Sequence, residues 1–241
     1  MSLTSEIKLG TLAPNELSAA SAMAARGMRD NPSSIAIHGD DPDTRVAGLT
    51  TMFSMILLNA ERPPLVARRH DIIVGLVAAS PPDICFFRKT AGRERVLRLC
   101  SKRMSVSMPS IPPGMILPML RLGLGRLGRL SKMGEVGMKH DPKEPHQHVE
   151  LVVVDAGLQG LGIGRVMMEQ VCRDLDKTPV MSHLETDKAE NVRFYEHFGF
   201  AVVDETDILD AHFWYMQRPA AQSPPAASDA GSNTADDAEQ K

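Results

Sequence analysis

The segment from residue 151 to residue 171 constrains the fold of this chain more than any other. It reads LVVVDAGLQGLGIGRVMMEQV, in which β-branched apolar residues lead into a turn holding Gly160, Gly162 and Gly164, and then into apolar positions at helical spacing. This pattern predicts a strand, a tight turn and a helix. Glycines let backbone N–H groups approach a ligand, and the first turn of a helix leaves N–H donors unpaired with a partial positive charge. The junction is therefore predicted to bind an anion such as a phosphate.

Two common phosphate-binding loops do not fit this turn. A P-loop ends in Gly-Lys-Ser/Thr, whereas Gly164 is followed by Arg165 and Val166. A dinucleotide loop of the form G-x-G-x-x-G needs a further glycine at position 165 or 167, and these positions hold Arg165 and Met167. An oxidoreductase of the dinucleotide-binding type is disfavoured for this reason. A third pattern, Q-x-x-G-x-G, fits at Gln159, Gly162 and Gly164.

A second motif follows this turn. In ENVRFYEHFGF, Asn191 and Tyr195 lie four residues apart, so they share one face of a helix that is predicted to begin near Glu190 and to end at Gly199-Phe200. One helix face then presents an amide and a phenol.

Together, Q-x-x-G-x-G and N-x-x-x-Y-x-x-x-G-F resemble the two motifs of the Gcn5-related N-acetyltransferase (GNAT) superfamily. Residues 140–218 are most similar to puromycin N-acetyltransferase-like members, including Lys-Glu-Pro before the strand and Leu-Glu-Thr before the last helix. The resemblance implies an α/β (α+β) fold, a single GNAT-type domain whose mixed, mostly antiparallel sheet is splayed at its central strand and flanked by helices. It also implies acetyl-CoA as cofactor.

The resemblance further implies which residues bind acetyl-CoA, with the pantetheine along the strand and the pyrophosphate on the turn. The expected cofactor-binding residues are Val152, Val153, Val154, Gln159, Gly160, Leu161, Gly162, Ile163, Gly164, Arg165, Asn191 and Tyr195. Leu161 departs from the pattern, because the family usually has Arg or Lys there, and Arg165 is expected to compensate.

Three residues are candidates for catalysis. An alkylammonium has a pKa of about 10.4, so a base must take its proton before the amine can attack a thioester. The resemblance places the base at His148 or Glu150, while Tyr195 is expected to protonate the departing thiolate. His148 and Glu150 lie at i and i+2 of the predicted strand, so we expect them on one face, continued by Val152 and Val154.

Structural roles remain open for the same residues. Tyr195 could be a core aromatic, and Asn191 could be a residue at the start of its helix. His148 could be a half-buried strand residue, and Glu185 could contact substrate or form an ion pair.

Acetyl transfer is expected to be direct, without an acylated cysteine, since Cys172 is the cysteine nearest the turn and lies a helix away.

The rest of the chain completes one domain, residues 1–218. The N-terminal half predicts a strand near Ile7, a helix stopped by Asn31-Pro32, a second helix capped by Asp41 or Asp43, and a hairpin over 63–80. A leucine-rich basic segment at about 113–137 predicts an inserted helix, either packed on the domain or lying on a membrane. Residues 219–241 have the composition of a disordered tail.

Composition excludes several classes of protein. A net charge of -3 predicts no general binding to nucleic acid or to membrane surfaces, and three scattered cysteines without a partner motif predict neither a disulfide framework nor a metal site. No signal peptide or membrane span is apparent, so we expect a cytoplasmic protein. A homodimer is left open.

The sequence therefore predicts an acetyl-CoA-dependent N-acetyltransferase. The expected acceptor is a primary amine of a small molecule, such as an amino-nucleoside, a drug or a metabolite amine. Two alternatives share the cofactor motifs: an acetyltransferase acting on protein lysines or N-termini, and a non-catalytic acyl-CoA sensor.

Overall fold

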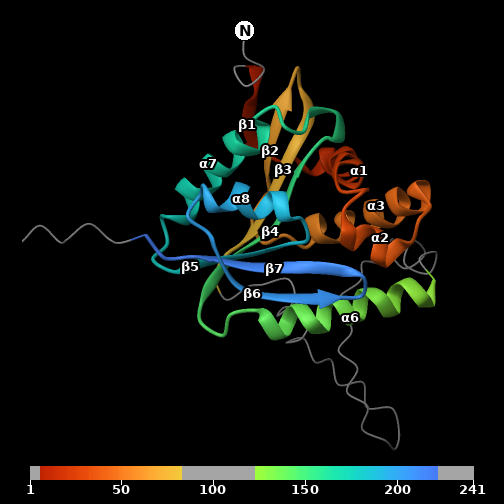
Figure 1. The fold of residues 1–241 in the computed structure, drawn as a ribbon. Helices are drawn as coiled ribbons and strands as arrows, with labels where there is room; N and C mark the ends of the chain where they lie inside the picture. Colours follow the sequence, from red (N-terminus) through yellow and green to blue (C-terminus); the bar gives the residue numbers. More distant parts are fainter. Residues whose placement is uncertain (1–5, 83–122, 222–241) are drawn as a thin grey trace, which may run out of the picture.

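The sheet runs through the whole molecule and carries helices on both faces (Figure 1). The computed structural model describes residues 6–82 and 123–221. Its seven strands lie in the order β1-β2-β3-β4-β5-β7-β6. The strands are β1 (Lys8–Thr11), β2 (Leu65–Arg69), β3 (Ile72–Ser80), β4 (His146–Val154), β5 (Met181–Thr186), β6 (Ala201–Ile208) and β7 (Ala211–Arg218). The helices are α1 (Leu17–Gly27), α2 (Pro32–His38), α3 (Pro42–Leu58), α6 (Leu124–His140), α7 (Ile163–Leu175) and α8 (Ala189–Glu196), with short 3-10 turns η2 (Pro14–Glu16) and η4 (Ala156–Leu158).

The junction between β4 and β5 is where the sheet changes character. Every other neighbouring pair is antiparallel, but β4 and β5 are parallel and pair only at His146–Met181, Gln147–Ser182 and His148–His183. Beyond these pairs β4 continues to Val154 and β5 to Thr186 without pairing to each other. The predicted mixed, mostly antiparallel sheet that is splayed at its central strand is thus present.

A β-bulge at Glu150 sets which way the residues of β4 face. The register of β4 against β3 shifts there, since Ala78 pairs with Leu151 and Ala79 with Val149. Because one extra residue reverses the alternation of side chains, Val149 and Val152 share a face although they are three apart. The expectation that Val152 and Val154 continue the face of His148 and Glu150 is therefore wrong.

Two hydrophobic clusters cover the two faces of the sheet. On one face, Met167 and Met168 of α7 pack with Val149, and Val152 and Val154 join this cluster. On the other face, α1 and α3 pack on Leu151 and Val153. The bulge thus divides the valines of β4 between two cores while leaving its polar residues near the β4–β5 junction.

The N-terminal helices differ from the sequence prediction in one respect. The first helix ends at Gly27, and Asn31-Pro32 does not stop a helix but begins α2, with Asn31 as its N-cap and proline in the first turn. Proline suits this position because its missing N–H would be unpaired there anyway. The predicted cap of the next helix is confirmed, since the Asp41 carboxylate accepts a 2.8 Å hydrogen bond from Thr44 N.

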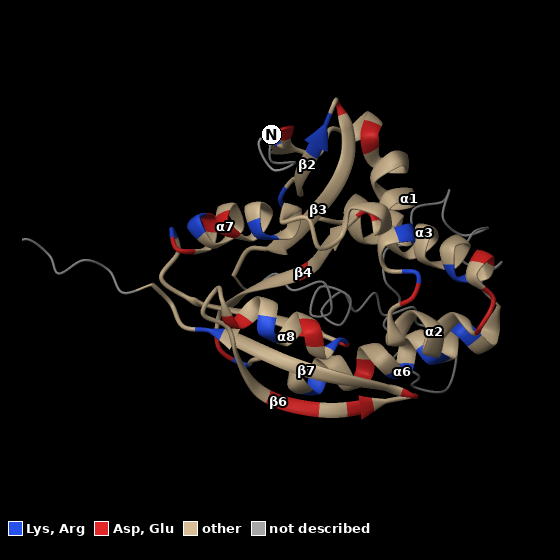
Figure 2. Ribbon diagram, turned by 45° about the horizontal axis from the view of Figure 1, so that its top comes forward, with Lys and Arg blue, Asp and Glu red and all other residues tan. Residues whose placement is uncertain are grey.

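The basic helix α6 packs on the domain. Met133 and Val136 contact the β6–β7 hairpin, while Arg126 and Arg129 donate to the carbonyls of His38 and Ile37 at the C-terminal end of α2. Cations are favourable there because the helix dipole leaves negative charge at that end. Figure 2 shows blue, basic positions on α6 and red, acidic positions on β6.

Some sequence predictions lie outside the described residues. These are the first part of the inserted segment, up to residue 122, and the tail from residue 222. Among the residues that the structure describes, no helix combines the length and the apolar character that a membrane span requires.

Gly27 provides a test of how closely α1 approaches the sheet. A Cβ at this position would lie 2.5 Å from the Val154 carbonyl oxygen and 2.5 Å from a methyl group of Val153. Replacing Gly27 by alanine should therefore lower the free energy of unfolding by about 1–3 kcal/mol, because α1 must move away from β4. Urea denaturation measures the change.

Gly128 in α6 is the matched control, because a Cβ there meets nothing within 4 Å. Gly128→Ala should raise stability by up to about 1 kcal/mol through helix propensity alone. Equal effects of the two substitutions would show that α1 does not pack against β4 at this distance.

Candidate active site

The backbone of β4 is exposed on one edge where β5 separates from it. Asp155 N donates to Val74 O at 2.9 Å. Every second residue of this part of β4, counted back from Asp155, therefore has its backbone groups directed at β3. The backbone groups of Val152 and Val154 consequently point to the opposite edge, which β5 has left. An extended ligand could pair with these groups as a strand would.

The turn after β4 presents the start of α7 to the same region. Gly160 and Gly162 have φ angles of 76° and 85°, a left-handed conformation that glycine adopts without strain. Gly162 is the N-cap of α7, and no side chain caps the helix. The first N–H groups of the helix, at Ile163, Gly164 and Arg165, therefore have no intrahelical acceptor. Uncapped amides beside two left-handed glycines form a site of the kind that binds an anionic group such as a phosphate.

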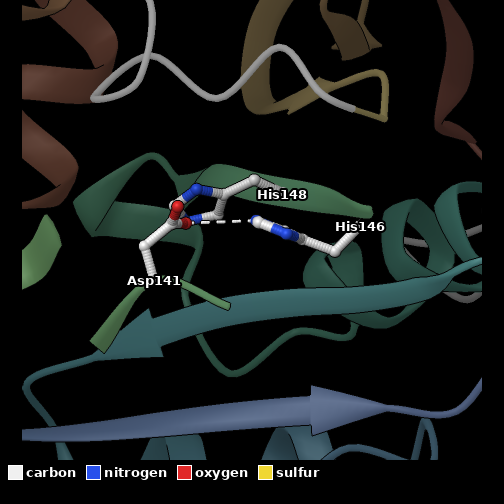
Figure 3. A group of neighbouring side chains, drawn as sticks. All are labelled: Asp141, His146 and His148. Carbon is white, nitrogen blue, oxygen red and sulfur yellow. Dashed lines mark hydrogen bonds and ion pairs between the residues drawn. The ribbon is translucent and has the colours of Figure 1, made fainter. Parts of the chain in front are cut away.

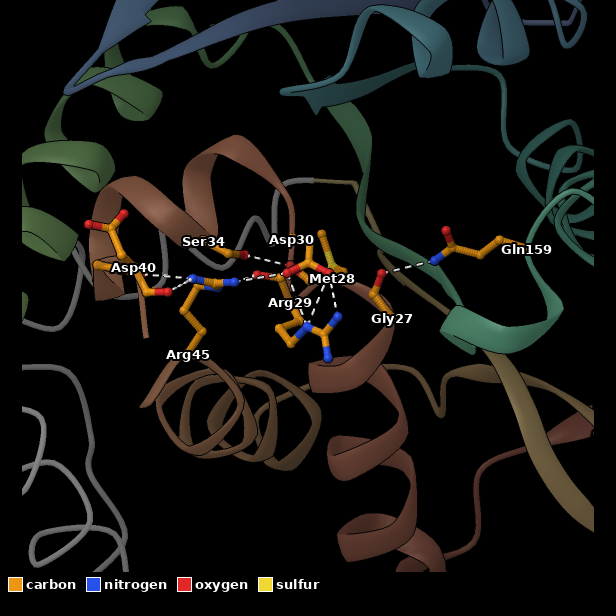
Figure 4. Close-up of polar contacts among 9 residues, drawn as sticks. Gly27, Met28, Arg29, Asp30, Ser34, Asp40, Arg45 and Gln159 are labelled. Atoms are coloured by element: carbon orange, nitrogen blue, oxygen red, sulfur yellow. Dashed lines mark hydrogen bonds and ion pairs between the residues drawn. The ribbon is translucent and has the colours of Figure 1, made fainter. Parts of the chain in front are cut away.

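Gln159 fixes this turn to the rest of the domain. Its side-chain nitrogen donates to Gly27 O at 2.9 Å and to Val154 O at 3.1 Å, so one amide joins the end of α1, the end of β4 and the turn (Figure 4). The side chain predicted to bind cofactor is thus engaged in holding the turn in place.

Two other predicted cofactor residues have exposed side chains. Leu161 is 47% exposed, and the Arg165 guanidinium, which is 76% exposed, forms an ion pair with Glu169 one turn along α7. Arg165 stands in the first turn of α7, beside the uncapped amides, so it can supply the positive charge that Leu161 lacks.

A buried arginine holds together the segment between α1 and α3. Arg45 donates to the carbonyl oxygens of Arg29, Gly39 and Asp40 and to the Asp30 carboxylate (Figure 4). Hydrogen bonds from Arg29 and Arg45 lower the pKa of Asp30 to about 2. This network ties the segments before and after α2 to α3.

Asp187 is a site residue that sequence reasoning missed. It follows β5, is buried, and accepts hydrogen bonds from Asn31 Nδ2 at 3.3 Å and from Ser33 N at 2.8 Å. Its partners lie more than 150 positions earlier in the chain, so spacing could not reveal the contact. The only sequence signal was the Asp-x-Pro pattern at Asp30 to Pro32.

Histidines and carboxylates gather at the last paired residues of β4 and β5. His148 Nε2 lies 2.7 Å from Glu185 Oε2, and Glu150 at the bulge accepts a hydrogen bond from Ser80 Oγ. Burial raises the pKa of the Glu185 carboxyl, but the adjacent His148 and His183 together lower it by more, so the net shift is downward. The group is therefore a carboxylate at neutral pH.

Tyr195 lies on α8 and is 6% exposed. In the described part of the chain its hydroxyl has no hydrogen-bond partner. Burial, followed by the charges of Glu185 and Asp187, raises the pKa of this phenol well above its usual value. Tyr195 therefore keeps its proton at neutral pH.

On the same helix, Asn191 Nδ2 donates to Thr186 Oγ1 at 3.1 Å, which ties α8 to the end of β5.

The structure thus brings the predicted residues together from three elements. The end of β4, the turn leading into α7 and the helix α8 all meet where β4 and β5 separate. Of the two candidate bases, His148 is buried, at 2% exposure, whereas Glu150 is partly exposed at the bulge.

Comparisons with known proteins agree with this geometry. Residues 133–217 match the family model described as an acetyltransferase (GNAT) domain. Among solved structures, the histone acetyltransferase HPA2 and related acetyltransferase from Corynebacterium glutamicum superposes with a TM-score of 0.59 at 15% identity, over 90% of this chain and 98% of that one. A polyamine N-acetyltransferase from Drosophila melanogaster has a TM-score of 0.58 at 15% identity, over 88% and 98% of the two chains.

A third structure contains the cofactor. The PaiA N-acetyltransferase from Thermoplasma acidophilum in complex with coenzyme A superposes with a TM-score of 0.51 at 12% identity, over 88% of this chain and 98% of that one. Over residues 133–217 the chain matches a GNAT acetyltransferase domain, and a domain of this kind is an acyltransferase that uses acetyl-CoA. The similarity to puromycin N-acetyltransferase-like members is not confirmed by these comparisons.

The left-handed glycine at the N-cap of α7 gives a direct test of cofactor binding. Alanine at position 162 would be strained by about 1–2 kcal/mol at this φ angle. Relief of that strain should turn the first amides of α7 away, so Gly162→Ala should weaken coenzyme A binding by about 5- to 30-fold. Isothermal titration calorimetry measures the affinity.

Gly157, in the 3-10 turn of the same loop, is the control, since its φ is not positive and a Cβ there would meet only Asp155 at 3.8 Å. Gly157→Ala should bind coenzyme A as wild type does. If Gly162→Ala kept wild-type affinity, the cofactor would not depend on this turn.

Proposed function

We propose that this protein transfers an acetyl group directly from acetyl-CoA to a primary amine of a small molecule, such as an amino-nucleoside, a drug or a metabolite amine. The observation that carries the proposal is the position of Tyr195. Its protonated phenol, which has no hydrogen-bond partner among residues 6–82 and 123–221, lies where β4 and β5 separate, close enough to Glu185 and Asp187 for their charges to act on it. A proton donor and a group of carboxylates thus meet at one point.

The proposed cofactor contacts follow from the backbone groups described above. Val152 and Val154 would pair with the pantetheine, and the amides from Gly160 to Arg165 would hold the pyrophosphate. Acetyl-CoA supplies an activated acyl group, because its thioester carries a good leaving group. A backbone N–H at the free edge of β4 can stabilise negative charge that develops on the acyl oxygen.

Tyr195 is proposed to act as the general acid. A thiol of the cysteine type has a pKa of about 8.5, well below that of a phenol raised by burial. The phenol therefore remains protonated when a thiolate forms beside it, and it can stabilise the departing thiolate by donating a hydrogen bond, while complete transfer of the proton from this weaker acid is unfavourable. Asn191 is proposed to contact the cofactor from the preceding turn of the same helix.

Glu150 is proposed as the base, directly or through a water molecule. The bulge places its carboxylate beside Ser80, at the point where β4 and β5 stop pairing. His148 was an equal candidate on spacing. In the fold it is buried, and Glu185 holds its Nε2, so a positioning role suits it better.

Direct transfer is supported by the state of Cys172. This cysteine is buried in the core cluster of α7, and burial raises the pKa of its thiol. A buried thiol with a raised pKa is a poor nucleophile, so an acyl-cysteine at this position is disfavoured.

The charge around the site supports a cationic acceptor. Glu150, Glu185 and Asp187 all lie near the ends of the two diverging strands, and carboxylates attract the ammonium form of an amine before it loses its proton. The neighbour from Drosophila is described as a polyamine N-acetyltransferase that forms N-acetylagmatine. Puromycin belongs among the candidates because of the motif resemblance.

Two other functions are each favoured by one observation. The Corynebacterium neighbour is described as a histone acetyltransferase and related acetyltransferase, which favours a protein amine as acceptor. Leu161 in place of a basic residue favours an acyl-CoA sensor.

A panel of agmatine, spermidine, puromycin and lysine peptides, with release of free thiol as the signal, separates these functions. Release with peptides alone would favour the protein acetyltransferase, and coenzyme A binding without release would favour the sensor.

Replacing Tyr195 by phenylalanine removes only the hydroxyl. We expect kcat for the preferred amine to fall by about 100-fold or more, with the dissociation constant of coenzyme A nearly unchanged. Stopped assays of thiol release measure the rate. Tyr215→Phe is the matched control, since Tyr215 is the other tyrosine and is also buried. A Tyr195→Phe protein with wild-type kcat would exclude the phenol as the acid.

Glu150→Gln tests the base. The neutral amide keeps the shape of the side chain but cannot accept a proton, so kcat/KM should fall by about 10²- to 10⁴-fold. His148→Gln should cost less. The assignment would be reversed if His148→Gln lost more activity than Glu150→Gln while both variants bound coenzyme A normally.

A further inference from the structure

We propose that Asp141, His146 and His148 form a binding site for a divalent transition-metal ion with the ligand preference of Zn²⁺. Each of the three side chains offers one ligand atom, and these atoms all lie within 4.8 Å of one another. Figure 3 shows the three side chains directed toward a common point between the end of α6 and the start of β4. Imidazole and carboxylate are the ligands that zinc accepts besides thiolate.

The local sequence explains why these groups converge. His146 and His148 lie at i and i+2 on β4, before the bulge, so their side chains leave the same face of the strand. Asp141 is the C-cap of α6, and the short connection from 142 to 145 returns the chain to the same place. The His146 side chain is 2% exposed and that of Asp141 is 7% exposed.

The hydrogen bonds of His146 give the first argument for a cation. Its Nδ1 lies 2.9 Å from the Glu144 carbonyl oxygen, which can only accept, so Nδ1 carries a hydrogen. Its Nε2 faces Asp141 Oδ1 at 3.1 Å. With Nδ1 engaged by this carbonyl, Nε2 is the ring nitrogen that can coordinate a metal ion together with the Asp141 carboxylate.

The separation of the two atoms suits the metal ion. Ligands about 2.0–2.1 Å from a tetrahedral zinc ion lie about 3.3 Å from each other. The Nε2 to Oδ1 distance of 3.1 Å is close to that value.

His183 gives an independent observation. It is 1% exposed, and its Nδ1 has no hydrogen-bond partner among the described residues. Its ring centroid lies 5.8 Å from that of His146 and 5.2 Å from that of His148. A buried, unpartnered imidazole nitrogen costs free energy unless it finds a partner. With His148 and Glu185 it forms a second group of converging ligand atoms.

The surroundings of both histidines resemble those of metal ligands. A histidine that binds a metal usually gives its other ring nitrogen to a carbonyl or a carboxylate, which fixes the ring orientation. His146 Nδ1 contacts the Glu144 carbonyl, and His148 Nε2 contacts the Glu185 carboxylate. Three protein ligands would leave a fourth position of the ion open for water or another group.

This site shares His148 with the surroundings of the proposed acetyl-transfer site, but metal binding is measured without acetyl transfer. The sequence prediction of no metal site relied on the cysteines. The pattern Asp-x₄-His-x-His was overlooked because it contains no Cys and its members lie in a loop and a strand.

The test is calorimetric titration of the metal-free full-length protein with Zn²⁺. We expect one equivalent to bind, and Co²⁺ used as a probe to show the visible absorption of a tetrahedral nitrogen and oxygen site. His146→Gln should weaken Zn²⁺ binding by more than about 100-fold. His212→Gln is the matched control, because its two ring nitrogens contact two different carboxylates, Asp207 and Glu205. It should bind Zn²⁺ as wild type does.

Asp141→Asn provides a second variant in case His146→Gln fails to fold, and it should weaken Zn²⁺ binding by at least about 10-fold. Coenzyme A affinity reports whether each variant is folded. The proposal is overturned if the wild-type protein binds no Zn²⁺ in the micromolar range, or if folded His146→Gln or Asp141→Asn binds it as tightly as wild type.

Discussion

The parallel ladder between β4 and β5 ends after three residue pairs, and the candidate site depends on that early end. Had the ladder continued, the backbone groups of Val152 and Val154 would be paired within the sheet, and no free strand edge would remain. Because it stops at His148 and His183, β5 leaves the edge of β4 uncovered from Val152 to the turn that starts α7, where Val154 O accepts a hydrogen bond from Gln159. A single ligand can then follow the strand edge and end on the uncapped amides of the helix.

The bulge at Glu150 divides the chemistry between the two faces of the sheet. Val152 and Val154 face α7 and belong to the same cluster as Tyr195, whereas Glu185 and His148 belong to the polar group on the other side. The sheet thus separates the proton donor, Tyr195, from the polar group of Glu185 and His148, except where β4 and β5 separate. This separation explains how one small site can hold a phenol that stays protonated near the Glu185 carboxylate, which stays charged.

Local patterns predicted the parts of this site that are local in sequence. Strand, glycine turn and helix over 151–171 are where hydrophobic periodicity and glycine placement put them, and Asn191 and Tyr195 share α8 as their spacing indicates. The bulge was not predictable, because it arises from pairing with β3. The start of α2 at Asn31-Pro32 was also missed, since a proline that stops one helix and a proline that begins another look alike. The Asp187 contacts and the anchoring of Gln159 on Gly27 join distant segments, which spacing along the chain cannot reveal.

Amide hydrogen exchange of the full-length protein, with and without coenzyme A, tests the central claim most directly. If the free edge of β4 and the first turn of α7 hold the cofactor, exchange should slow over residues 152–165 and remain unchanged in the β6–β7 hairpin, which lies at the far edge of the sheet. Slower exchange elsewhere, with residues 152–165 unaffected by saturating coenzyme A, would contradict the account and place the cofactor on another part of the fold.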